Sequence, residues 1–209
     1  MEPGSLSPVI LTGQKVTLRP MNISRDIPTL YKLSNGSPIV TETHSIPAYD
    51  AKEVLWKYFS WDCFESVNQM KDYYKNCLIK SDVQIFTLFD NETYQPIGSL
   101  GYGYIFPKKF SVEIVTVWVS PIAQGTGKCS EAVYLMIEHA FRVGFRFVNW
   151  GCYPENLRSM RMPERFGFKF KECIKAYEQK GDDCFDLILF EIELSDWELR
   201  KKGPCWYGI

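Results

Sequence analysis

Three strand-like segments joined by very short connections constrain the fold of this 209-residue chain more than any other feature. They span residues 83–90, 96–106 and 112–120, and polar residues or a Pro-Lys-Lys turn separate them. Parallel neighbours would need a crossover of roughly a dozen residues or more, so connections this short predict an antiparallel meander. The other elements must therefore be arranged around a sheet that already contains three strands.

Hydrophobic periodicity and turn residues predict helices and further strands on both sides of the meander. In chain order we expect a strand over 15–19, a helix over 22–36, one or two helices over 51–80, an amphipathic helix over 127–143, a strand over 146–153, a helix over 156–166 and a terminal hairpin ending in a strand over 184–194. The sum is one mixed α/β domain over residues 1–209. We expect residues 1–13 to be mobile and 196–209 to form a C-terminal tail.

Composition excludes several classes of protein. Lys and Arg total 24 against 25 Asp and Glu, a formal net charge of −1, which disfavours nucleic-acid binding. No apolar run approaches the roughly 18 residues of a membrane span, and the N-terminus lacks the pattern of a signal peptide. The seven cysteines contain no Cys-x-x-Cys pair, so neither a disulfide framework nor a metal site is indicated. We therefore expect a soluble cytoplasmic protein without a membrane partner.

A glycine-rich turn opens the amphipathic helix, in the run Gln124-Gly125-Thr126-Gly127-Lys128-Cys129-Ser130-Glu131. Unpaired N–H groups and the helix dipole make such a turn an anion site suited to a phosphate. The alternative is that the glycines only form a tight turn. A Walker A loop is excluded by Ile122 and Cys129, where it needs Gly and Ser or Thr. A Rossmann fingerprint is excluded because Ser130 replaces its last glycine and no acidic residue follows about 20 positions later.

These residues resemble the GCN5-related N-acetyltransferases, the GNAT superfamily, and more narrowly its RimJ/RimL-like branch. The acetyl-CoA loop of that family falls on Gln124, Gly127 and Cys129, where cysteine departs from the usual Gly or Ala but is still small. The other matching motifs are Glu113-Ile114, Ser130-Glu131-Ala132, His139-Ala140-Phe141 with Gly144, Asn156 with Ser159, and Arg165-Phe166-Gly167-Phe168. The likeness is dense over 111–168 and weak over 35–80. It implies a central, mostly antiparallel, splayed sheet flanked by helices.

The resemblance also implies acetyl-CoA as the acetyl donor and no metal. Its pyrophosphate would bind the backbone N–H groups of the loop, and its pantetheine arm would pair with a strand edge. Asn156 would hydrogen-bond the pantetheine amide, and Lys128 would add a charge. The implied cofactor-binding residues are Trp118, Val119, Gln124, Gly125, Thr126, Gly127, Lys128, Cys129, Ser130 and Asn156.

Two residues are candidates for the chemistry of acetyl transfer to an amine. Glu113 is the implied general base, the alternative being an outward or salt-bridged strand residue. Ser159 is the candidate donor to the leaving thiolate, the alternative being a helix N-cap. Many relatives have a tyrosine seven residues after the motif's Asn, but this chain has Pro163, which excludes a tyrosine acid there. That proline also predicts a kink or a helix that starts near 159–160.

The acceptor implied by the resemblance is a primary amine, on a protein N-terminus or a small molecule, acetylated by direct transfer. Segments 35–75 and 177–183 would contact it, and acidic residues such as Glu178 favour a cationic acceptor. His44 and Glu42 are second-rank candidates at this site, whereas His139 is expected to be a packed or surface helix residue. A catalytically inactive acyl-CoA-binding or interaction module is the alternative function. A homodimer is left open.

Overall fold

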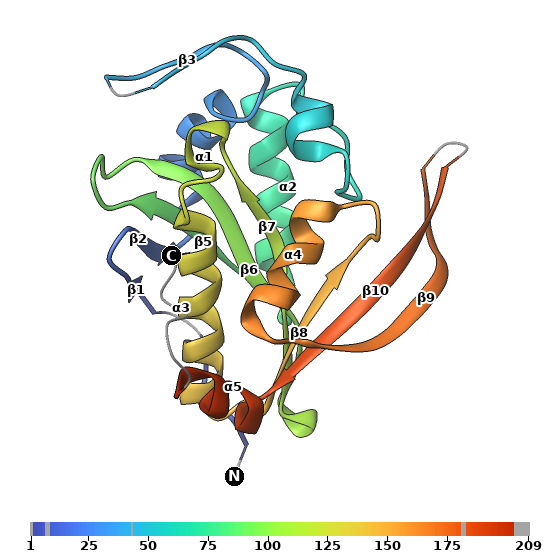
Figure 1. Cartoon of the computed structure of the whole chain (residues 1–209). Coiled ribbons are helices and arrows are strands. Elements are labelled where there is room, and N and C mark those ends of the chain that lie inside the picture. Colours follow the sequence, from blue (N-terminus) through green and yellow to red (C-terminus); the bar gives the residue numbers. More distant parts are fainter. Residues whose placement is uncertain (1, 7–8, 43, 181–182, 203–209) are drawn as a thin grey trace.

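The computed structural model describes residues 2–6, 9–42, 44–180 and 183–202, and it contains an eight-stranded sheet in the order β1-β2-β5-β6-β7-β8-β10-β9 (Figure 1). At its centre, β5 (Gln84–Asp90), β6 (Pro96–Phe106) and β7 (Ser111–Val119) form the predicted antiparallel meander. Among the described strands only β7 and β8 (Phe147–Cys152) pair in parallel. The connection between them is long enough to contain a helix, as parallel pairing requires.

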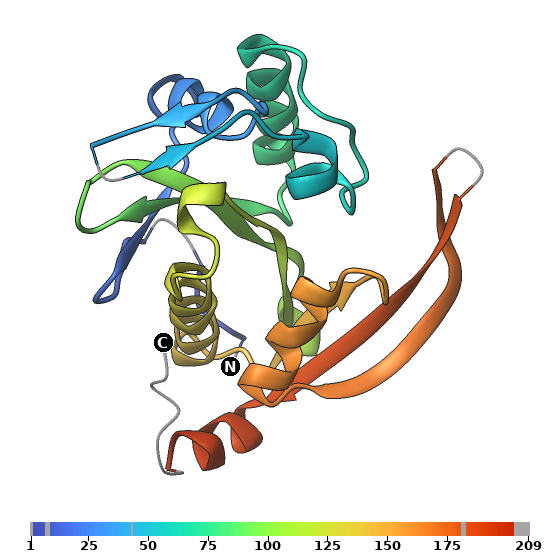
Figure 2. The ribbon, with the colours of Figure 1, turned by 45° about the horizontal axis from the view of Figure 1, so that its top comes forward.

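Antiparallel hairpins form both edges of the sheet. One edge consists of β1 (Leu11–Thr12) and β2 (Val16–Pro20). The other consists of β9 (Lys169–Lys180) and β10 (Asp183–Glu193), which project away from the rest of the molecule (Figure 2). A separate ribbon, β3 (Ile39–Val40) with β4 (Ser45–Ile46), lies between the segments predicted as helices over 22–36 and 51–80.

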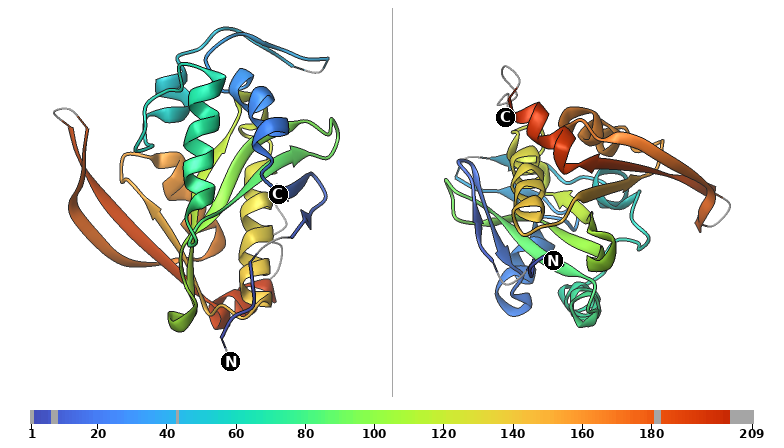
Figure 3. Two further views of the ribbon diagram at one scale, coloured as in Figure 1. Left: turned by 180° about the vertical axis from the view of Figure 1, so that it is seen from behind. Right: turned by 90° about the horizontal axis from the view of Figure 1, so that it is seen from below.

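Helices cover both faces of the sheet (Figures 1 and 3). One face carries α1 (Ile23–Lys32), the π-helical turn η1 (Lys52–Trp56) and α2 (Val67–Ile79). The other carries α3 (Lys128–Arg142), α4 (Leu157–Phe166) and α5 (Leu194–Lys201). The short 3-10 turns η2 (Pro107–Lys109) and η3 (Pro121–Ala123) precede and follow β7.

Each face has its own hydrophobic core. Met136, Phe166 and Trp197 are fully buried in the larger cluster, under α3, α4 and α5. Trp56 and Tyr74 are buried in the smaller one, under α1, η1 and α2. The indole Nε1 of Trp118 in β7 donates to the Tyr74 hydroxyl over 2.9 Å, which fastens α2 to the sheet. This bond holds α2 in place beside the part of β7 that later lines the site.

The structure corrects three expectations. Leu6 and Leu11, in the segment expected to be mobile, are buried because apolar surface on α3 and β2 accepts them. The expected C-terminal tail is partly helical, since α5 begins at Leu194 and buries Trp197; residues 203–209 lie outside the described residues. Finally, the late start near 159–160, one of the two alternatives that Pro163 suggested, is not observed: α4 begins at Leu157, within the predicted range 156–166, because the Asn156 side chain caps it.

Candidate active site

The divergence of β7 from β8 opens the candidate site. The two strands pair only from Ser111 to Ile114, and beyond this β7 continues alongside β6 alone. A bulge near Thr116, whose φ is 53°, shifts the register with β6. A positive φ is rare for a β-branched residue, and bulges of this kind bend a strand. Residues 115–119 therefore offer a strand edge, on the side of β8, that no described strand occupies.

A cavity of about 1140 Å³ lies beside this free edge. Its walls come from β7, β8, the start of α4, the segment 53–61 and the β9–β10 hairpin. At one end lie Gln124, Cys129 and Asn156, next to the first turn of α3. The lining also includes Glu113 on β7 and, farther along the hairpin, Glu178 on β9. The cavity thus connects the glycine-rich turn to a carboxylate on β7.

The glycine-rich turn is held in shape by its own hydrogen bonds. Gly127 is the N-cap of α3 with a φ of 83°, a conformation that glycine adopts without strain. The Thr126 hydroxyl donates to the Ala123 carbonyl over 2.8 Å, and the Gln124 amide donates to the Val119 carbonyl over 3.4 Å. The first N–H groups of α3 lack partners within the helix, as at any helix N-terminus, and they supply the predicted anion site.

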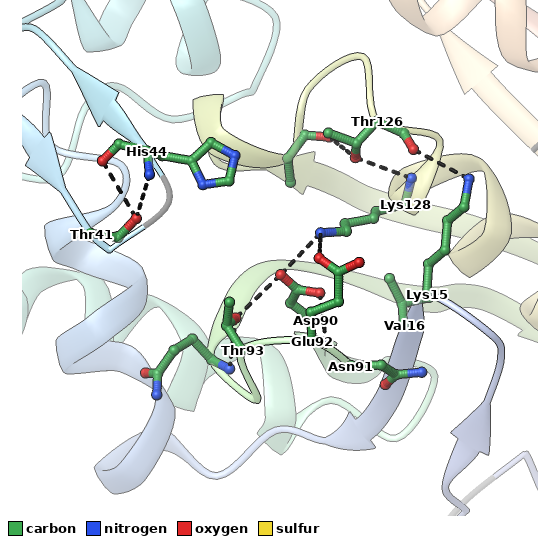
Figure 4. A network of polar contacts seen from close by, with 12 residues as sticks. Lys15, Val16, Thr41, His44, Asp90, Asn91, Glu92, Thr93, Thr126 and Lys128 are labelled. Carbon is green, nitrogen blue, oxygen red and sulfur yellow. Dashed lines mark hydrogen bonds and ion pairs between the residues drawn. The ribbon is translucent and has the colours of Figure 1, made fainter.

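Side chains of the turn serve the fold rather than the cavity. The Lys128 ammonium lies 3.0 Å from Asp90 and 3.7 Å from Glu92, at the end of β5 (Figure 4). Ser130 accepts a hydrogen bond from Arg165 over 2.9 Å. The Lys128 charge is therefore neutralised within the protein, contrary to the expectation that it would face the cofactor. Only the backbone of these residues is left for an anion.

Two other predicted cofactor residues also have occupied side chains. The Trp118 indole is buried and bonded to Tyr74, so only its backbone is available. Asn156 uses its Oδ1 to accept from the Ser159 N–H over 3.2 Å, and its amide nitrogen is left to donate. Cys129 stands where the family usually has Gly or Ala. Burial raises the pKa of its thiol to about 12, so the thiol stays neutral beside a bound anion.

Glu113 lies where β7 begins to leave β8. Its carboxylate sits over Gly151, where an added Cβ would approach Oε1 to 3.0 Å, so a residue with a side chain would crowd it. Burial raises the pKa of Glu113 to about 7, and the nearby Lys171 ammonium opposes this shift. No described Lys or Arg forms an ion pair with it. The alternative of a salt-bridged strand glutamate is therefore not supported.

Ser159 lies in the first turn of α4, facing β8. The Trp150 indole donates to its Oγ over 3.1 Å. A hydroxyl that accepts this bond can still donate its own hydrogen. The alternative role of N-cap belongs to Asn156 instead. Ser159 and Glu113 both line the same cavity.

The histidines are not brought to this site. Neither His44 nor Glu42 lines the cavity, and His44 lies on the β3–β4 ribbon near the network of Figure 4. His139 is buried in α3, with its Nδ1 3.3 Å from the Tyr102 hydroxyl. Burial and the nearby Arg142 charge together lower the pKa of His139 to about 4, so the ring is neutral at pH 7. It is a packed helix residue, as expected.

Several lining residues were missed by sequence reasoning. Trp150 lies in β8 and Tyr153 directly follows it, and no local motif distinguishes either residue from a core aromatic. Arg158 contacts the Gln124 side chain over 2.9 Å and the Val54 carbonyl over 3.4 Å, joining α4 to both walls of the cavity. Its position directly before Ser159 was the only signal that could have drawn attention to it.

In the described part of the chain no three His, Cys, Asp or Glu residues are grouped so that they could hold a metal ion. No helix there has the length and apolar character to span a membrane. The six cysteines that are described all carry free thiols.

Comparisons with known proteins agree with this geometry. Curated proteins gave no match. A probable GNAT-family acetyltransferase from Chromobacterium violaceum is 23% identical, with 95% of this chain and 92% of that one covered and a TM-score of 0.82. An acetyltransferase from Salmonella typhimurium that modifies the N-terminal serine of ribosomal protein L7/L12 is 18% identical, with 89% and 99% covered and a TM-score of 0.72.

A structure of RimL, an acetyltransferase of the same ribosomal protein, in complex with coenzyme A is also similar, at 18% identity, 90% and 99% coverage and a TM-score of 0.68. At these identities the solved structures establish the fold. The model of the acetyltransferase (GNAT) domain matches residues 15–169, which include the meander, the glycine-rich turn and α4. Since this match covers most of its length, the chain belongs to the GNAT acetyltransferase family.

Proposed function

We propose that this protein is an acetyl-CoA-dependent N-acetyltransferase that moves the acetyl group directly from coenzyme A to a primary amine. One observation carries the proposal: a single cavity joins the first turn of α3, an anion site, to the half-buried Glu113 carboxylate, which has no ion-pair partner in the described chain. The free thiols of the described cysteines are consistent with a reducing, cytoplasmic setting.

The acetyl donor would be held mainly by backbone groups. N–H groups of Gly125, Gly127 and Cys129 would bind the pyrophosphate, and the free edge of β7 at Val119 would pair with the pantetheine arm. Asn156 would donate its amide N–H to the same arm. RimL, a protein of the same fold, has been solved with coenzyme A, which supports this use of the fold.

Glu113 would remove a proton from the ammonium form of the acceptor. A carboxylate whose pKa is about 7 is a stronger base than an ordinary glutamate and is still ionised in part at neutral pH. The free amine then attacks the thioester carbonyl carbon, so that a C–N bond forms and the C–S bond breaks. Ser159, whose Oγ is held by the Trp150 indole, would donate a hydrogen bond to the departing thiolate.

Replacing Glu113 tests the proposal. We expect Glu113→Gln to lower turnover by roughly 10²-fold or more while acetyl-CoA affinity changes little, because the base is removed and the donor site is not touched. Turnover is measured as free thiol released from acetyl-CoA, and affinity by calorimetric titration. The exposed Glu164→Gln on α4 is the matched control and should behave as the unchanged protein. Undiminished turnover in Glu113→Gln would remove this residue from the mechanism.

The alternative, an inactive acyl-CoA-binding module, is favoured by one observation, namely that Cys129 and Pro163 replace residues common in the family. The same measurements separate the two functions. A module would bind acetyl-CoA in the titration yet release no thiol with any amine. An enzyme would release thiol with at least one class of amine.

A further inference from the structure

We propose that the acceptor carries a second cationic nitrogen, and that Glu178 with the surrounding tyrosines binds it. The chemical class that fits is an aliphatic diamine, with one amine acetylated at Glu113 and the other held at the hairpin. This inference rests on the proposed function and names its acceptor. Four observations carry it, all from residues that line the cavity.

The first observation is a tyrosine–carboxylate pair at the hairpin end of the cavity. The buried Tyr153, just after β8, donates its hydroxyl to Oε2 of the half-buried Glu178 on β9. Burial and this bond raise the pKa of Tyr153, so the phenol stays protonated and acts as the donor. No described Lys or Arg pairs with Glu178. Its other lone pairs are available to a ligand cation.

The second observation is a set of aromatic rings around this carboxylate. Tyr58 lies with its ring centroid 6.4 Å from that of Tyr153, and Tyr104 is hydrogen-bonded to Tyr177. That bond and burial raise the pKa of Tyr104 to about 12, so it is also neutral. All four tyrosines line the cavity. Electron-rich ring faces beside a carboxylate attract an alkylammonium group.

The third observation is an apolar strip between the two carboxylates. The Glu113 carboxylate, Leu187 and Leu189 all lie beside Gly151, and Ile174 is opposite Leu187 on the neighbouring strand. Glu178 is opposite Phe185, four residues along β10 from Leu189. At about 3.3 Å per residue this separation is about 13 Å along the strand, before the side chains reach toward each other. A chain of methylene groups suits such a strip.

The fourth observation concerns what does not fit. Lys171, the cation whose charge acts on Glu113, is engaged by Glu191 and Asn149, so it leaves Glu113 available to an ammonium. A peptide would place N–H and C=O groups on Ile174, Leu187 and Leu189, which offer them no hydrogen bonds. A monoamine would leave Glu178 unused. The arrangement therefore favours a diamine over either.

Matched substrates test this inference. Thiol release from acetyl-CoA is measured with straight-chain monoamines, with α,ω-diamines of equal length, and with a short peptide that has a free N-terminus. We expect at least one diamine to exceed its monoamine by roughly tenfold or more in kcat/KM, because a partly buried cation site adds this much binding. Added salt should reduce the preference, since the second contact is ionic.

Variants identify the residues. Glu178→Gln should abolish the preference through a higher KM for diamines while monoamine kinetics stay the same, and Tyr153→Phe should weaken it. The control Glu193→Gln, exposed on the same hairpin and outside the cavity lining, should retain it. Equal rates for monoamines and diamines, a faster peptide, or an intact preference in Glu178→Gln would overturn this inference and leave the proposed function standing. If no amine of any class gives thiol release, both this inference and the proposed function are overturned.

Discussion

At the scale of a residue, the cost of holding Glu113 in the cavity should be measurable apart from catalysis. Its pKa is raised from 4.5 to about 7 by burial, so the folded protein resists ionisation of this group. Below pH 4.5 the carboxyl is protonated in both folded and unfolded chains and costs nothing. Between pH 4.5 and about 7 the unfolded chain ionises while the folded chain stays largely protonated, so stability falls over this range and the loss is complete once pH has risen through the folded pKa.

We therefore predict that Glu113→Gln raises the free energy of unfolding at pH 8 by about 1–3 kcal/mol, because glutamine resembles the protonated side chain and is never ionised. At pH 4 the two proteins should be equally stable. Urea unfolding at both pH values checks this. If the variant gains nothing at pH 8, the carboxylate is not buried as the structure shows.

The same titration sets the pH dependence of the reaction. Because the base must be ionised, kcat/KM should rise with pH through about 7 and then level off, until another group titrates. A pH–rate profile measured at saturating acetyl-CoA tests this expectation. The range from pH 5.5 to pH 8 lies above the ordinary pKa of glutamate. A profile that is flat over that range would therefore assign the proton transfer to some other group.

At the scale of elements, α3 is tied to the first strands by one side chain. The buried Glu131 carboxylate accepts the backbone N–H groups of Gln14, Lys15 and Val16 over 2.8, 2.8 and 3.0 Å. Gly13 leaves room for it, since an added Cβ would come within 2.7 Å of Glu131 Cδ. The β1–β2 connection and the glycine-rich turn are thereby fixed to each other.

Glu131→Gln should destabilise the fold by about 1–3 kcal/mol, because the amide turns an N–H group toward backbone donors that then lack an acceptor. Acetyl-CoA affinity should also fall, since the first turn of α3 is held less firmly. Urea unfolding and calorimetric titration check both effects. Glu164→Gln, exposed on α4, is the control for loss of a charge on a helix. An unchanged free energy of unfolding would show that these three bonds contribute little.

Elements with strong local signals could be predicted, and those that depend on distant partners could not. Short connections predicted the meander, and Gly127 before an amphipathic run predicted the start of α3, because both signals are local. The two-residue strands β1 and β3 are too short to show an alternating pattern. Glu131 and Tyr153 act through partners more than 20 positions away in sequence, so no motif marks them. At the site, the family resemblance named Glu113 as the base, but only the folded hairpin brings Glu178 into the same cavity.

At the scale of the whole molecule, the cavity is closed by segments that are far apart in the chain. The wall opposite β8 comes from residues 53–61, and the hairpin supplies residues 171–178. Arg158 links α4 to Gln124 and to the Val54 carbonyl. Acetyl-CoA bound at the glycine-rich turn would therefore contact β7, the turn and α4 together. Because it binds only the folded protein, its binding free energy adds to the free energy of unfolding.

Acetyl-CoA at about 100 times its dissociation constant should raise the free energy of unfolding by about 2.7 kcal/mol. Amide hydrogen exchange should slow in residues 115–130 and at the start of α4, and it should stay unchanged in the β3–β4 ribbon, which does not line the cavity. Gly127→Glu places a side chain and a negative charge at the N-cap of α3, so it should remove both effects. If exchange slows around the hairpin alone, or if Gly127→Glu still responds to acetyl-CoA, the donor does not bind at the glycine-rich turn and the assignment of the two ends of the cavity must be reversed.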